Sequence, residues 1–224
     1  MKVICFDLDD TLCKEIDYLK SAYREIAEYA AEHCRGCSDP VSVLAHKAYD
    51  EMLAAYRVGQ NAFDVLNSFL GLDLPIADYL YIYRNHKPKI ALCEDVVRTL
   101  DALKAEGVRI GLITDGRSVQ QRNKIEALGL GRWIENADIV VSEEIGSEKP
   151  ALANYEYFMN RYPECQDFTY VGDNPRKDFI APNSLGWMTV WLNDDGRNIH
   201  RQDFTSTPAL ALPKKTIESL EELI

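Results

Sequence analysis

Carboxylates and a hydroxyl follow the first apolar run of the chain. Residues 3–6 are Val-Ile-Cys-Phe, and Asp7, Asp9, Asp10 and Thr11 come directly after or close behind them. A short run of this composition is typical of a buried parallel strand, which needs no charge at its end. If the extended conformation persists, Asp7 and Asp9 point to the same side and can share one cation. Taken alone, the pattern also fits a solvated turn or a helix cap.

Three further polar groups each follow an apolar run later in the chain. They are Thr114-Asp115-Gly116, Lys149-Pro150 and the segment Gly172 to Asp178. In open α/β sheets, ligands bind at the carboxyl ends of the strands. The order and spacing of the four groups therefore predict one site built from four loops.

These four groups together resemble the haloacid dehalogenase superfamily of hydrolases, and the resemblance covers the whole chain. It implies an α/β fold: a Rossmann-like, doubly wound parallel sheet with an inserted α-helical cap. The implied activity is that of a Mg²⁺-dependent phosphatase working through an aspartyl phosphate. Its expected substrate is a small phosphorylated metabolite, such as a sugar phosphate, a sugar-acid phosphate or a nucleotide.

The resemblance assigns Asp7 as the nucleophile and Asp9 as the general acid and base. Because a carboxylate and a phosphomonoester are both anionic, a positive group must lie between them. Mg²⁺ prefers oxygen ligands, and the expected ones are Asp7, the backbone carbonyl of Asp9 and Asp173. Asp178 is expected to bind the ion through water or to orient the site.

The other two loops are expected to hold the phosphoryl group. Lys149 supplies a second positive charge, and Thr114 supplies a hydroxyl. Gly116 lets the backbone approach a phosphate oxygen just before a helix begins. The family pattern usually has Asn where this chain has Asp115, a change that alters specificity only if the side chain faces the substrate. The remaining candidate substrate contacts are Lys14, Glu15 and Arg117.

Asp9, the second aspartate of the first group, narrows the set of reactions that the resemblance implies. Family members that cleave carbon–halogen bonds lack it, so Asp9 favours phosphoryl transfer from oxygen. A phosphomutase of the β-phosphoglucomutase type stays open, because the same aspartyl phosphate can pass to a second hydroxyl. A non-catalytic phosphate-binding or receiver-like signalling module is a further alternative.

Length and composition limit the class of protein. A chain of 224 residues fits one domain with a large insertion. The net charge of −11 disfavours binding to nucleic acid, and no apolar stretch is long enough for a membrane span. We expect reduced thiols, a cytoplasmic location, and a monomer or weak homodimer. Cys34 and Cys37 have the spacing of half a zinc site or of a redox pair, but an inert helix-to-loop transition ending at Gly36 is favoured.

The periodicity predicts a discontinuous catalytic core, 1–13 and 89–224, and a helical cap, 14–88. The second cap helix is expected to begin near Val41, with Ser38 or Asp39 as its cap and Pro40 at the first helical position. Most of the cap tyrosines are expected to fill its core. Later strands are predicted at 108–113, 138–141, 168–171 and 187–192, and helices at 119–128, 152–161, 176–185 and 216–223.

Overall fold

The computed structural model describes residues 1–35, 38–205 and 207–224. The chain divides into two compact units. The larger combines Met1–Ile16 with Ala91–Ile224, and the smaller is Asp17–Ile90. The larger unit carries the four polar groups identified in the sequence.

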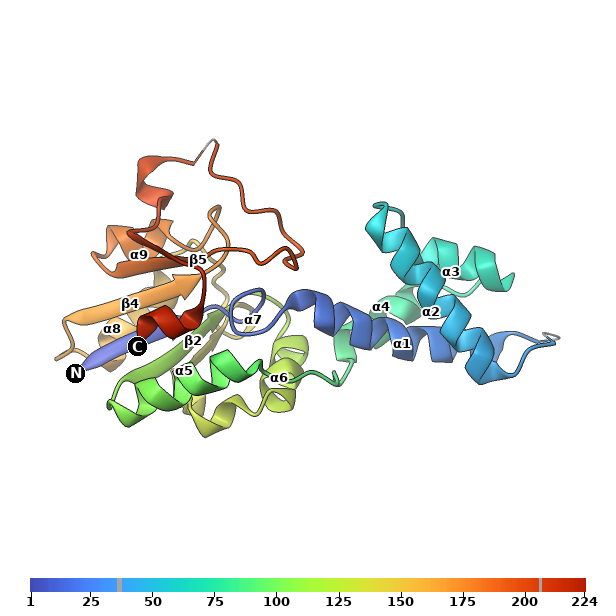
Figure 1. Cartoon of the computed structure of the whole chain (residues 1–224), viewed down its shortest axis with the longest axis horizontal. Coiled ribbons are helices and arrows are strands. Elements are labelled where there is room, and N and C mark those ends of the chain that lie inside the picture. The colour runs from blue at the N-terminus through green and yellow to red at the C-terminus, as the bar shows by residue number, and fades with distance from the viewer. Residues whose placement is uncertain (36–37, 206) are drawn as a thin grey trace. The chain divides into compact units, whose positions relative to one another are not determined.

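A six-stranded, all-parallel sheet forms the centre of the larger unit (Figure 1). Its order is β3-β2-β1-β4-β5-β6. The strands are β1 (Lys2–Phe6), β2 (Arg109–Thr114), β3 (Ile139–Val141), β4 (Asp167–Gly172), β5 (Met188–Leu192) and β6 (Lys215–Ile217). The order reverses between β1 and β4, and such a switch point is where open α/β sheets bind ligands.

Helices cover both faces of this sheet (Figure 1). They are α5 (Glu94–Ala105), α6 (Ser118–Ala127), α7 (Ser142–Ile145), α8 (Ala153–Arg161) and α9 (Ile180–Ser184), with short 3₁₀ helices at Leu130–Arg132, Asn136–Asp138, Ala209–Ala211 and Leu220–Leu223. Tyr155 and Phe158 of α8 pack in one buried cluster with Val3 and Cys5 of β1. Strand β1 is buried because both of its faces are covered. The predicted doubly wound α/β fold is confirmed.

Four helices make up the smaller unit within its described residues. They are α1 (Glu15–His33), which begins in the larger unit, α2 (Val41–Arg57), α3 (Ala62–Leu70) and α4 (Ile76–Asn85). The apolar stripe of α1, which includes Leu19, Tyr23 and Ile26, is buried as its spacing predicts. None of the helices in the described ranges has both the length and the apolar character needed to cross a membrane.

Aromatic side chains fill much of the smaller unit. Tyr18, Tyr23 and Tyr79 are buried, and the Tyr79 hydroxyl donates to Asn67 Oδ1 at 2.7 Å. The predicted core role is confirmed for these three tyrosines, whereas Tyr81 is 70% exposed. Burial of a ring with its hydroxyl paired is the usual way for tyrosine to stabilise a small core.

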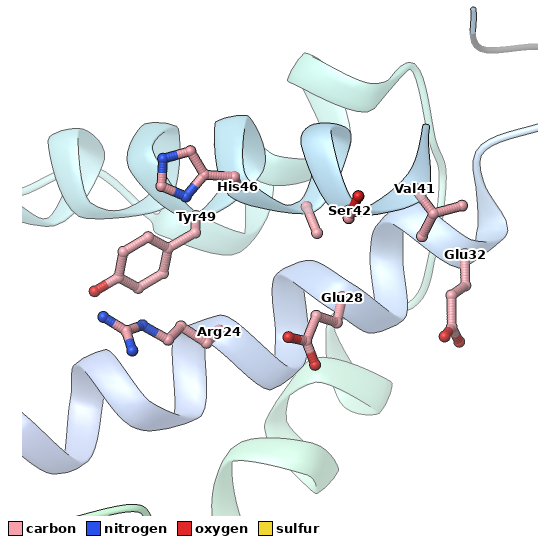
Figure 2. A pocket seen from close by; sticks show the side chains of 8 residues that line it. Arg24, Glu28, Glu32, Val41, Ser42, His46 and Tyr49 are labelled. Carbon is pink, nitrogen blue, oxygen red and sulfur yellow. The ribbon is translucent and has the colours of Figure 1, made fainter. Parts of the chain in front are cut away.

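A hollow of about 620 Å³ lies between α1 and α2 in the smaller unit (Figure 2). The Arg24 guanidinium lies over the Tyr49 ring, 5.2 Å from its centroid. The lining residues are Arg24, Glu28, Glu32, Val41, Ser42, Ala45, His46 and Tyr49. None of the carboxylates or lysines predicted to do chemistry is among them.

Two local predictions about helices are wrong. Helix α2 has Pro40 as its N-cap with no side-chain cap, and the Asp39 carboxylate pairs instead with Lys47 at 2.7 Å. The predicted helix 176–185 begins only at Ile180, because the Asp178 carboxylate accepts the Asn174 N–H and closes a turn ahead of it. A carboxylate that pairs with a nearby N–H competes with helix formation.

The end of the chain also departs from prediction. The expected helix 216–223 is wrong, because Lys215–Ile217 forms edge strand β6 beside β5. Only Leu220–Leu223 is helical, as a 3₁₀ turn that begins at a capping box on Ser219.

The cysteines are placed only in part. Cys5, Cys13, Cys93 and Cys165 are free thiols, but Cys34 is disulfide-bonded, so the expectation of reduced thiols fails there. Gly36 and Cys37, where the first insert helix was expected to stop, lie outside the described residues.

Close packing of β2 on α8 generates a test. A Cβ added at Gly111 would overlap the Phe158 ring and lie 2.8 Å from Cys5 Sγ. We expect Gly111→Ala to lower the free energy of unfolding by about 1–3 kcal/mol, as measured by urea denaturation. Gly131→Ala is the control, because nothing lies within 4 Å of its added Cβ. Equal stability of the two variants would contradict this packing.

Candidate active site

A tight turn redirects the chain immediately after β1. The Leu8 carbonyl accepts the N–H groups of Leu12 and Cys13 at 3.0 and 3.1 Å. Asp10 has a left-handed backbone (φ 58°), which aspartate tolerates better than most residues. Its carboxylate accepts the N–H groups of Glu15 and Ile199 at 2.9 and 3.0 Å. Asp10, which had no predicted role, therefore holds the shape of the loop that carries Asp7.

Lys149 joins the loops after β1 and β4. Its ammonium lies 2.8 Å from an oxygen of Asp7 and 2.8 Å from an oxygen of Asp178, and all three side chains are buried. It also donates to the Tyr170 hydroxyl at 3.0 Å. Burial alone would lower the pKa of Lys149, but the charges of Asp178 and Asp7 outweigh it and raise that pKa well above the ordinary value. The lysine therefore stays charged.

Three carboxylates crowd one point beside this lysine. Asp7, Asp173 and Asp178 each offer an oxygen, and these oxygens lie within 4.8 Å of one another. Burial, followed by the charges of Asp178 and Asp7, raises the pKa of Asp173 to about 9. Burial raises the pKa of Asp7 to about 6, against the opposing charge of Lys149. Such an all-oxygen, charge-crowded set fits a hard divalent cation such as Mg²⁺.

A loop after β5 fixes Asp173. Asn198 Nδ2 donates to the Asp173 carboxylate at 3.0 Å. Gln202 and Trp191 donate to the Asp173 carbonyl oxygen at 2.9 and 3.1 Å. Partners of this kind hold a potential metal ligand in one orientation. Asn198 and Gln202 were missed because residues beyond 193 form an irregular polar loop with no periodic pattern.

Asp9 is held by two side chains from α6. Lys124 Nζ lies 2.6 Å from Asp9 Oδ1, and Gln121 Nε2 lies 3.0 Å from Oδ2. Although burial alone would raise it, Lys124 and Gln121 lower the pKa of Asp9. Lys124 is only 1% exposed. Both partners were missed, but they occupy inward positions of α6 that an amphipathic helix would fill with apolar residues.

In the loop after β2, the Thr114 hydroxyl and the Gly116 N–H each have a hydrogen-bond partner within the protein. Gln121 Nε2 also donates to the buried Thr114 Oγ1 at 2.8 Å, and the Gly116 N–H donates to Ser142 Oγ at 3.0 Å. Gly116 has φ 141°, and an added Cβ would lie 3.1 Å from Gln121 Nε2. A backbone with this φ, so close to the Gln121 side chain, thus needs glycine at position 116.

The Asp115 side chain points into the site's own loops. Its Oδ1 accepts the Lys149 N–H at 3.0 Å, and its Oδ2 pairs with Lys177 Nζ at 2.9 Å. The carboxylate therefore connects the loop after β2 to the loops that follow β3 and β4.

The three predicted substrate contacts have different surroundings. Lys14 Nζ donates to Asn198 Oδ1 at 2.6 Å and pairs with Asp195 at 3.1 Å. Burial, followed by the charge of Asp9, raises the pKa of Glu15 to about 7. Arg117 is exposed, 4.0 Å from Glu143. Lys14 is thus engaged within the larger unit, whereas Glu15 is influenced by Asp9.

The parallel sheet thus carries carboxylates and a buried lysine at its switch point. The family model of the haloacid dehalogenase-like hydrolases matches residues 1–186. The chain belongs to this family and is a hydrolase, as the four sequence motifs predicted.

Two archaeal relatives match over most of their length. The chain is 29% identical to the glyceraldehyde 3-phosphate phosphatase of Methanocaldococcus jannaschii, covering 100% of this chain and 96% of that protein. It is 30% identical to the enzyme of the same name from Methanopyrus kandleri, covering 85% and 83%. A magnesium-bound HAD hydrolase of Bacillus subtilis has a TM-score of 0.65 at 21% identity, covering 99% and 96%, which shows the fold alone.

The raised pKa of Asp173 predicts a pH-dependent stability without metal. The folded protein binds this proton more tightly than the unfolded chain, whose carboxyl has a pKa near 3.8. Stability from this group is complete below about pH 4 and is lost as the pH rises towards about 9. We expect the unfolding free energy of wild type, relative to Asp173→Asn, to fall from about pH 5 to 9 in EDTA. The free energies are measured by urea denaturation at each pH. A difference between wild type and Asp173→Asn that stays constant over that range would contradict this prediction.

Proposed function

We propose that this hydrolase is a Mg²⁺-dependent phosphatase that removes the phosphoryl group of a small phosphorylated metabolite through an aspartyl phosphate on Asp7. The observation that supports it most strongly is the Asp7 carboxylate, 2.8 Å from the buried Lys149 ammonium and beside Asp173 and Asp178. A nucleophile, a fixed positive charge and a set of metal-ligand oxygens thus share one sheet edge.

In the first step, a carboxylate oxygen of Asp7 attacks the phosphorus atom. The new bond joins that oxygen to phosphorus, and the bond from phosphorus to the substrate oxygen breaks. Against the effect of burial, Lys124 and Gln121 lower the pKa of Asp9, and the negative charge of the bound substrate opposes them and favours the protonated form. Protonated Asp9 gives its proton to the departing oxygen, which leaves as an alcohol. Lys149 stabilises the negative charge on the transferring phosphoryl group, and the Thr114 hydroxyl and the loop at Gly116 bind its oxygens.

In the second step, water attacks the same phosphorus atom. Asp9, now a carboxylate, takes a proton from the water, and the bond between phosphorus and Asp7 breaks. Inorganic phosphate leaves and the Asp7 carboxylate is restored. One residue therefore acts as acid and then as base.

The proposed ligands of Mg²⁺ are Asp7, the backbone carbonyl of Asp9 and Asp173, with Asp178 orienting the site or acting through water. When bound, the ion offsets the repulsion between the Asp7 carboxylate and the phosphate oxygens. Both oxygens of Asp178 already have partners, Lys149 and the Asn174 N–H, which favours the orienting role.

Two observations support the proposed substrate class: the position of the inserted helical unit and the names of the related enzymes. We propose that the helical unit Asp17–Ile90 is a cap that restricts access to small molecules, because it is inserted directly after the first motif. Lys14, Glu15 and Arg117 remain candidate substrate contacts. Glyceraldehyde 3-phosphate is the first compound to test, followed by other sugar phosphates, sugar-acid phosphates and nucleotides.

Removing the nucleophile tests this proposal. With an aryl phosphate and Mg²⁺, we expect Asp7→Asn to lower the rate of phosphate release by more than about 1,000-fold, a loss typical of a missing nucleophile. The control is Asp167→Asn, an exposed carboxylate at the amino end of β4, with unchanged rate expected. Activity of Asp7→Asn comparable to wild type in a pure preparation would refute the assignment. Release of isomers without phosphate from hexose phosphates would indicate a mutase instead.

A further inference from the structure

Asp115 brings a negative charge into the loop that is proposed to bind phosphate. It stands between Thr114 and Gly116, the two residues whose hydroxyl and backbone are assigned to the phosphoryl oxygens. Its side chain is 16% exposed, so bulk water screens the charge only in part. An uncompensated carboxylate here would repel an anionic substrate.

The structure supplies a compensating charge from another loop. Asp115 Oδ2 lies 2.9 Å from the ammonium of Lys177, which follows β4 between Asp173 and Asp178. Asp115 Oδ1 accepts the Lys149 N–H at 3.0 Å, so the carboxylate is fixed from two sides. The ion pair is therefore part of the framework that joins the phosphate loop to the metal-ligand loop.

The charge of Lys177 also acts on the proposed reacting groups. Its side chain is 33% exposed, and its charge acts to lower the pKa of both Asp7 and Asp9. The preceding residue, Arg176, is exposed. Lys177 thus acts on the site while its neighbour in sequence faces solvent.

We propose that Lys177 is a positioning residue that determines anion affinity. By pairing with Asp115, it cancels the negative charge of the phosphate loop and holds that loop in place, so that the site accepts the oxygens of a phosphoryl group. This inference rests on the proposed function, and it identifies a residue that acts through Asp115 rather than by touching the substrate.

The test is a double-mutant cycle read by binding of inorganic phosphate in the presence of Mg²⁺, using calorimetry. We expect Lys177→Met to weaken phosphate binding by at least about 10-fold, which corresponds to about 1.4 kcal/mol. Asp115→Asn alone should bind phosphate at least as tightly as wild type. The double variant should recover to within about 3-fold of wild type, because neither charge is left unpaired.

Two further variants separate charge from structure. Lys177→Arg keeps the charge and should bind nearly as wild type, whereas Arg176→Met is the matched neighbour and should change nothing. Thermal unfolding of each variant confirms that it is folded. The inference is overturned if Lys177→Met binds normally, or if the double variant stays as weak as Lys177→Met, because Lys177 would then contact phosphate itself.

Turnover by wild type is measured separately on the same preparation. Failure of the proposed function would appear as absence of phosphate release from every phosphomonoester tested. Failure of the present inference would appear as the wrong order of phosphate affinities among the variants, with wild-type turnover intact.

Discussion

The site depends on the two ion pairs that the buried Lys149 ammonium makes with carboxylates. Burying a lysine is costly unless carboxylates surround it, and burying two carboxylates together is costly unless a cation lies between them. Lys149 lies 2.8 Å from both Asp7 and Asp178, which come from the loops after β1 and β4. A residue that follows β3 thus fixes the ends of two strands that are neighbours at the centre of the sheet. Removing the lysine would leave two buried carboxylates with no cation between them.

The same rule of pairing extends across the sheet edge. Asp7 pairs with Lys149, Asp9 with Lys124 and Asp115 with Lys177. Five carboxylates of the predicted motifs, Asp7, Asp9, Asp115, Asp173 and Asp178, are accompanied by these three lysines. Two formal negative charges remain, which equals the charge of one divalent cation. The raised pKa of Asp173 has the same origin, because protons take up the excess charge when no cation does.

Much of this arrangement could be predicted because strands and motif residues are local in sequence. Apolar runs ending in Asp7, Thr114 and Asp173 indicate strands whose carboxyl ends meet, and the sheet has them there. Lys124 could not be assigned, since its role depends on which face of α6 is inward. Asn198 comes from an irregular loop, and β6 is too short for its pattern to be distinguished from a helix.

Asp7 is proposed to carry the phosphoryl group between the two steps, and chemical trapping tests this role most directly. Enzyme mixed with substrate and Mg²⁺ would be quenched in acid, reduced with borohydride, which converts an aspartyl phosphate to homoserine, and analysed by peptide mass spectrometry. The proposed mechanism predicts substrate-dependent homoserine at position 7. Reduction at a different residue during turnover, with position 7 unmodified, would contradict it.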